Sequence, residues 1–105
     1  MSSRKSRAGS PEMRVGTLRL ELHLPASDSL KAKRSVVNRV KERVRSRFNA
    51  SIAEVDHQDL WQRATLGVAI VGGESGVLDR VLHDILACVE SEDRLAVLDY
   101  QIQVD

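Results

Sequence analysis

In the stretch VGTLRLELHL, residues 15–24, polar and apolar side chains alternate without interruption from Thr17 to Leu24. Because successive side chains of a strand point to opposite faces, this period of two predicts a strand with one buried face. Pro25 follows and ends the strand, since proline has no amide hydrogen to give to a sheet. The predicted inner row is Leu18, Leu20, Leu22 and Leu24, and the outer row is Thr17, Arg19, Glu21 and His23.

Two helices and three further strands are expected downstream. Ser27, Asp28 and Ser29 supply N-cap oxygens, and apolar residues at helical spacing predict a first helix from Leu30 to Phe48. Strands are expected over 50–55, 61–71 and 98–104, and a second helix over 75–92. The glycine pair at 72–73 separates the third strand from that helix.

The resulting order is strand, helix, strand, strand, helix, strand. It predicts the α+β class and a ferredoxin-like βαββαβ fold, with a four-stranded antiparallel sheet and two helices on one face. Right-handed crossovers place the first and third strands in the middle of the sheet. The chain has 105 residues, which is room for one domain. We expect that domain over 13–105, after a disordered basic N-terminal extension over 1–12.

Composition excludes several classes of protein. Hydrophobic residues make up 42% and charged residues 30%, as in a folded soluble protein. No apolar run approaches the roughly 18–20 residues that cross a bilayer, and the basic start lacks the apolar segment of a secretory signal. The single cysteine, Cys88, has no partner for an internal disulfide, which favours the cytoplasm.

Charge is segregated along the chain. Residues 1–48 contain thirteen lysines and arginines against four acids, and the remainder contains three against eleven. Such asymmetry is typical of a protein that orients on a polyanion or on a second copy of itself.

The first predicted helix carries most of the positive charge, with eight lysines and arginines and one acid, Glu42. On a helical wheel four of the cations share one flank with Asn38, in a ridge roughly 20 Å long. Such a ridge can neutralise phosphates and bind nucleic acid without base specificity, and the competing interpretation is a solvated helix face. The predicted nucleic-acid-binding residues are Lys31, Arg34, Lys41 and Arg45 on the flank, with Lys33 adding to the field.

Chemistry-bearing residues are sparse elsewhere. The run from Glu54 through Asp56 and His57 to Asp59 is the best place for an enzyme or a cation site, but it matches no metal-binding spacing, and a polar hairpin turn is the favoured interpretation. Cys88 lies in an apolar helix without an adjacent base, so inert burial is expected. We therefore predict no catalytic residue, metal or cofactor.

Three aromatic residues are present. Phe48 and Tyr100 fall on apolar periodic faces and are expected in the core, so a stacking platform on the sheet is not expected. Trp61 is expected to staple the hairpin while Asp59 caps its turn. The alternative is a partner surface near the sheet edge formed by Asn49, Glu54, Asp59, Trp61 and Gln62.

Several segments together resemble the YlxP-like family of small bacterial proteins, a domain of unknown function. They are VG at 15–16, SLKAKR at 29–34, FNASIAEV at 48–55 and QDLWQRA at 58–64. The resemblance covers essentially all of 13–105 and implies a ferredoxin-like fold. An acid usually stands in that family where this chain has Ala32, so this helix is more basic than its relatives'.

Family genes are often found beside those for translation initiation factor two and ribosome-binding factor A. The resemblance thereby implies ribosome-related or RNA-binding work, and it implies no catalytic residues.

We expect a non-enzymatic accessory protein that contacts RNA or a ribosomal subunit through the basic helix. The alternative is a self-associating interaction or regulatory module with no nucleic-acid binding. In that reading an edge strand, at 50–55 or 98–104, pairs between two copies to form a homodimer.

Overall fold

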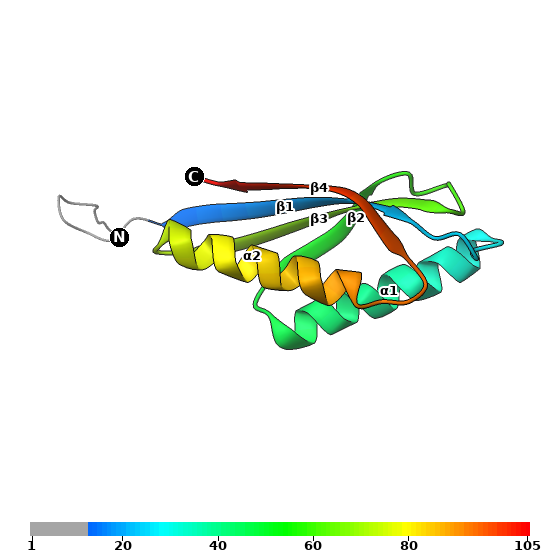
Figure 1. The fold of residues 1–105 in the computed structure, drawn as a ribbon, viewed down its shortest axis with the longest axis horizontal. Helices are drawn as coiled ribbons and strands as arrows, with labels where there is room; N and C mark the ends of the chain where they lie inside the picture. Colours follow the sequence, from blue (N-terminus) through cyan, green and yellow to red (C-terminus); the bar gives the residue numbers. More distant parts are fainter. Residues whose placement is uncertain (1–12) are drawn as a thin grey trace, which may run out of the picture.

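A computed structural model describes residues 13–105 and contains one sheet and two helices (Figure 1). The strands and helices follow in the predicted order, and the predicted extension, residues 1–12, lies outside the described residues. The elements are β1 (Arg14–His23), α1 (Leu30–Arg47), β2 (Ser51–Asp56), β3 (Arg63–Gly72), α2 (Ser75–Glu90) and β4 (Ala96–Val104).

The sheet is antiparallel with the strand order β2-β3-β1-β4, so β2 and β4 are its edges. Both helices cover one face, and the other face is open (Figure 1). α1 packs over β2, and α2 packs over β1, β3 and β4. This arrangement is the ferredoxin-like fold, and it confirms the predicted fold class and the predicted central strands.

The inner row of β1 forms the centre of the core. Leu20, Leu22 and Leu24 are fully buried, and Leu18 is almost so. Their partners on β3 face the same helices, because Leu20 lies opposite Leu66 in the antiparallel register. The alternation that predicted the strand therefore also predicted which side chains pack beneath α1 and α2.

α1 begins where the sequence predicted. The hydroxyl Oγ of Ser29 accepts a hydrogen bond of 3.0 Å from the amide of Ala32, which satisfies one of the free amides of the first turn. The helix ends at Arg47, and the amide of Phe48 donates to the carbonyl of Val44. Its inner face buries Val36, Val37, Val40 and Val44.

The prediction that Tyr100 is a core residue is wrong. Tyr100 is 47% exposed, and Leu98 of the same predicted inner row is 54% exposed. β4 is an edge strand, so side chains on its helix-facing side have a neighbour on one flank only. A register shift opposite Glu21 and Leu22 also leaves Leu98 without a paired residue on β1. Phe48, in contrast, packs partly buried against the core.

No helix within residues 13–105 has the length and apolarity needed to cross a membrane.

Candidate nucleic-acid interface

Four cations of α1 lie along the side of the helix that faces away from α2. Lys31, Arg34 and Arg45 are exposed and Lys41 is partly exposed. At the far end of this row, Nη2 of Arg45 donates to the carbonyl of Ile52 at 3.1 Å, which places the row beside the edge strand β2. We call Lys31, Arg34, Lys41 and Arg45 the α1 ridge. Asn38 is exposed on the same flank.

The opposite flank of α1 is engaged with α2 and the segment after it. Nη2 of Arg43 lies 3.5 Å from Oε1 of Glu92, and Nη1 of Arg47 lies 3.9 Å from Sγ of Cys88. Hydrogen bonds from Arg94 hold the pKa of Glu92 below its ordinary value of 4.5, against the opposing effect of burial. These cations therefore serve intramolecular contacts. On the α1 ridge, Arg45 is also bonded within the chain, to the carbonyl of Ile52, whereas Lys31, Arg34 and Lys41 form the outward-facing part of the row.

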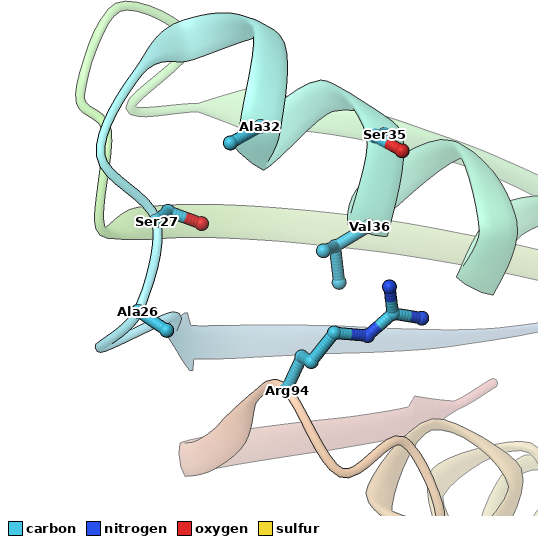
Figure 2. Close-up of a pocket in the computed structure, with 6 residues that line it drawn as sticks. All are labelled: Ala26, Ser27, Ala32, Ser35, Val36 and Arg94. Carbon is cyan, nitrogen blue, oxygen red and sulfur yellow. The ribbon is translucent and has the colours of Figure 1, made fainter.

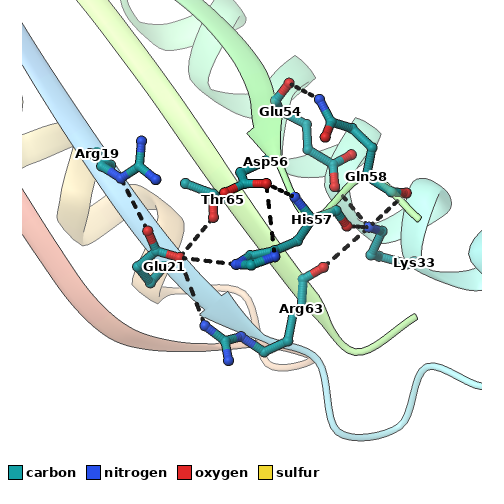
Figure 3. Close-up of polar contacts among 9 residues, drawn as sticks. All are labelled: Arg19, Glu21, Lys33, Glu54, Asp56, His57, Gln58, Arg63 and Thr65. Carbon is teal, nitrogen blue, oxygen red and sulfur yellow. Dashed lines mark hydrogen bonds and ion pairs between the residues drawn. The ribbon is translucent and has the colours of Figure 1, made fainter. Parts of the chain in front are cut away.

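Lys33, predicted to add to the phosphate-binding field, is instead inside the protein. Its side chain is completely buried. The ammonium Nζ lies 2.8 Å from Oε2 of Glu54 and donates to the carbonyls of His57 at 2.7 Å, Arg63 at 3.1 Å and Gln58 at 3.2 Å (Figure 3). No surface is left for a phosphate. A buried charge is tolerated only when it is paired and hydrogen-bonded, and Lys33 meets both conditions.

The position of Lys33 in the sequence carries a signal for this burial. Lys33 precedes Val37 by four residues and Val40 by seven, so it continues the apolar stripe of α1 toward the N-terminus. A lysine on an otherwise apolar stripe, with an acid such as Glu54 on the neighbouring strand, indicates an internal ion pair. From its residue type alone, Lys33 was predicted to lie at the surface.

The β2–β3 hairpin is built around this ammonium. His57 has a φ of 61°, the left-handed region that non-glycine residues seldom adopt. Its carbonyl accepts from Lys33 and also from the amide of Leu60 at 3.1 Å, which closes a turn over 57–60. The carboxylate that accepts from the turn is that of Asp56, whose Oδ1 lies 2.7 Å from the amide of His57, and not that of Asp59.

The prediction that Trp61 staples the hairpin is also wrong. Trp61 is 54% exposed and its neighbour Leu60 is 45% exposed. The next residue, Gln62, fastens the loop: Nε2 donates to the carbonyls of Pro25 at 3.2 Å and Ser27 at 3.3 Å, just before α1 begins. The hairpin tip and the N-terminal end of α1 are therefore adjacent.

A second polar cluster lies on the open face of the sheet and was not predicted (Figure 3). The buried hydroxyl of Thr65 donates to Oε1 of Glu21 at 2.7 Å, and Nε of Arg19 donates to Oε2 at 3.2 Å. Arg63 Nη2 and His57 Nε2 approach the same carboxylate at 3.8 and 4.0 Å. The strand register places these residues together, since Glu21 is opposite Thr65. The carboxylate is fully engaged, so the cluster joins β1 to β3.

Two of the hollows beside α1 lie at its opposite ends. One, about 530 Å³, adjoins the C-terminal end of the α1 ridge and is lined by Arg45, Asn49 and Ser51 among others. The other, about 270 Å³, lies beside the first turns of α1 between Ser27 and Arg94 (Figure 2). The guanidinium of Arg94 donates to the carboxylate of Glu92 at 2.8 Å, so the cation of the second hollow already has a partner within the chain.

Within the described part of the chain, no group of three or more histidine, cysteine, aspartate or glutamate side chains is arranged to hold a metal ion. Of the run at 54–59, Glu54 is bonded to Lys33 and His57 approaches Glu21. Cys88 is a free, buried thiol.

Comparison with known proteins identifies the family. The model of a family described as "Protein of unknown function (DUF503)" matches residues 15–102, nearly the whole described chain. The chain belongs to this family. The "Uncharacterized protein YlxP" of Bacillus subtilis (strain 168) is 36% identical over 77 residues, which cover 73% of this chain and 84% of that protein. Membership in the family confirms the resemblance found in the sequence.

Among solved structures, the fold is similar to that of a de novo designed protein, Foldit4. The TM-score is 0.53 at 15% identity, and the match covers 90% of this chain and 97% of the designed one. At that identity the likeness concerns the fold alone.

Proposed function

We propose that this protein is a non-enzymatic accessory protein that binds RNA phosphates through the α1 ridge. The observation that carries the proposal is the separation of the α1 cations. Arg43 and Arg47 make contacts toward α2, whereas Lys31, Arg34 and Lys41 project along the side of the helix away from it. A row of cations roughly 20 Å long spans several phosphates of a nucleic-acid strand.

The electrostatic setting of the ridge supports this proposal. The first turn of α1 contains no acid, so the positive end of the helix dipole is not neutralised there. Glu42 is the acid that pairs with the ridge, through a 3.4 Å contact to Arg45. The side chain of Glu42 is 76% exposed, so this ion pair is weak. Cations such as Lys31 near the N-terminus of α1 lower the stability of the helix. A cost of this kind is typical of a functional site, and here it favours binding of a negatively charged partner.

A non-enzymatic role agrees with how the acidic and nucleophilic groups are used. The carboxylate of Glu54 accepts from Lys33, and that of Glu21 accepts from Thr65 and Arg19. The thiol of Cys88 is buried. These groups are engaged in the folded chain and are not free for substrate. We further propose that the RNA is ribosomal and that the protein works in the cytoplasm, as the family resemblance implies.

The test is a titration of residues 13–105 against purified small and large ribosomal subunits at low and physiological salt. The variant has Lys31, Arg34, Lys41 and Arg45 changed to Glu. The control reverses Arg39, exposed on the same helix but outside the ridge. Saturable binding at physiological salt that the ridge variant loses and the Arg39→Glu control keeps is expected. Equal binding by the ridge variant contradicts the proposal.

A second candidate function is self-association through β4, and the exposure of its side chains favours it. Leu98 and Tyr100 are large apolar residues exposed on this edge strand. Residues 96–104 contain no lysine or proline, the residues that commonly prevent an exposed edge strand from pairing with another chain. The other edge, β2, is shorter, has an irregular register at Glu54 and lies beside the cationic ridge, where two copies would repel each other.

The two-fold pairing we favour places Tyr100 opposite Ile102 of the second copy. Asp99 then faces Gln103 of that copy, so no like charges oppose, and an aromatic ring meets a β-branched side chain. In this reading the protein is an interaction module without nucleic-acid binding. Sedimentation equilibrium tests it: Tyr100→Lys is expected to abolish a dimer that Val71→Lys, which introduces the same charge at an exposed apolar residue of β3, leaves intact. A monomer at all concentrations excludes this candidate.

A further inference from the structure

The tip of the β2–β3 hairpin exposes two neighbouring large apolar side chains. Leu60 is 45% exposed and Trp61 is 54% exposed. The indole of Trp61 offers an aromatic face to solvent, which the sheet surface does not, since the open-face residues of the central strands include no aromatic.

The main chain on both sides of Trp61 is firmly held. On one side, the amide of Leu60 donates to the carbonyl of His57, which also accepts from buried Lys33. On the other side, the amide of Leu24 donates to the carbonyl of Gln62 at 2.9 Å. The loop is therefore ordered before any ligand arrives, and binding to it requires little further loss of conformational freedom.

Trp61 also lies at the N-terminal end of the α1 ridge. Gln62 contacts the carbonyl of Ser27, two residues before the N-cap Ser29, and Lys31 follows in the first turn. Lys33, which directly precedes the ridge member Arg34, contacts the hairpin. A strand whose phosphates lie over the first turns of α1 thus passes close to the hairpin tip that carries Trp61.

We propose that Trp61 stacks on an unpaired base of the RNA, so that the ligand of this site is a single-stranded or looped segment. The proposal rests on the proposed function and names its substrate class. Bases in an RNA duplex are stacked on one another and present no free face, whereas unpaired bases stack readily on aromatic side chains. Asp59, exposed at the same tip, disfavours a phosphate there and leaves the base over the hairpin.

The chain has a single tryptophan, so its own fluorescence reports on the site. The full chain of 105 residues is titrated with a single-stranded RNA and with a blunt RNA duplex that has the same number of phosphates. Indole emission and the anisotropy of end-labelled RNA are followed in parallel. Quenching by the single strand and not by the duplex is expected.

Two variants complete the experiment. Trp61→Ala is expected to bind the single strand roughly tenfold more weakly, and Trp61→Phe, which keeps an aromatic face, within about threefold of the wild type. Both are expected to bind the duplex as the wild type does. Circular dichroism confirms that each variant is folded, and Leu60→Ala controls for a general loss of apolar surface at the tip.

The outcomes separate this inference from the function on which it rests. The stacking proposal is wrong if the wild type binds RNA with unchanged indole emission. It is also wrong if Trp61→Ala binds the single strand with full affinity. In either case the α1 ridge alone is the interface. Equal losses for the single strand and the duplex in Trp61→Ala also overturn stacking. Failure of the wild type to bind either RNA removes the proposed function itself.

Discussion

The ammonium of Lys33 lies 2.8 Å from the carboxylate of Glu54 beneath the β2–β3 hairpin, and it is shielded completely from solvent. Three main-chain carbonyls of the hairpin complete its hydrogen bonding. This ion pair joins α1 to β2 and β3, so the most basic helix of the chain uses one of its cations to hold the fold.

Lys33→Met is expected to lower the free energy of unfolding by about 3–5 kcal/mol, because it leaves the largely buried carboxylate of Glu54 without its cation and takes the ammonium donor away from three carbonyls. Urea denaturation followed by circular dichroism measures the change. Lys31→Met, the same substitution at an exposed position two residues earlier, is the control and is expected to change stability by less than about 0.5 kcal/mol. Equal effects of the two substitutions contradict the internal role of Lys33.

A comparison of variants at Lys33 and Lys41 separates the effect on folding from the effect on RNA binding. At a temperature where the Lys33→Met variant is folded, its affinity for a blunt RNA duplex, which makes no use of Trp61, is expected to match that of the wild type. Lys41→Glu, on the α1 ridge, is expected to weaken RNA binding without the same loss of stability. Filter binding at two salt concentrations measures both. If the Lys33→Met protein is folded but does not bind the RNA duplex, Lys33 contributes to RNA binding and the prediction is wrong.

The salt dependence of RNA affinity is expected to distinguish the two flanks of α1. Replacing Arg34 by Gln removes one phosphate contact and reduces the slope of log affinity against log salt by about one. Arg39→Gln removes the same charge from an exposed residue outside the ridge and is expected to leave the slope nearly unchanged. Identical slopes for the two variants would mean that only net charge matters.

Close packing of α2 on β1 depends on Gly16. A Cβ at this position would lie 2.9 Å from Cδ1 of Leu82, a fully buried side chain with little room to move. Gly16→Ala is therefore expected to destabilise the protein by about 1–3 kcal/mol in thermal denaturation. Gly73→Ala, where a Cβ meets nothing within 4 Å, is the control and is expected to be neutral or slightly stabilising. A neutral Gly16→Ala would refute this close packing.

Acid stability is expected to depend on Glu92. Arg94, and more weakly Arg43, hold the pKa of Glu92 below 4.5, so the folded state binds this proton less readily than the unfolded chain does. The resulting stability is present above pH 4.5 and is lost as the pH falls through the lowered pKa. Glu92→Gln is expected to cost about 1–3 kcal/mol at neutral pH and less at acid pH. Thermal melts across this range test it, with exposed Glu90→Gln as control.

The fold was predictable because its strongest signals are local. Leu20 and Leu22 alternate with polar neighbours, and Ser29 stands directly before a helical pattern, so each residue indicates its own environment. Tyr100 obeys the same alternation, yet it is half exposed. Its burial depends on which strand lies beside it, and alternation within one strand carries no information on whether that strand is an edge.

The candidate site was predictable only in part, and for a related reason. Composition located the basic helix, and the wheel placed Arg34 and Arg45 on one flank. The fate of Lys33 depends on Glu54 and on carbonyls of a loop more than 20 residues away, which only the folded chain brings together. Trp61 was expected to staple the hairpin, whereas the bonds of Lys33 and Gln62 stabilise the loop without it.

The convergence of the His57, Gln58 and Arg63 carbonyls on one ammonium also restricts evolution of the hairpin. Surface loops normally tolerate insertions and deletions. Adding or removing a residue between 57 and 63 would move at least one carbonyl out of reach of Lys33 and leave a buried cation short of acceptors. Among relatives that retain a lysine at this position, we expect this hairpin to keep a constant length while the α2–β4 connection varies.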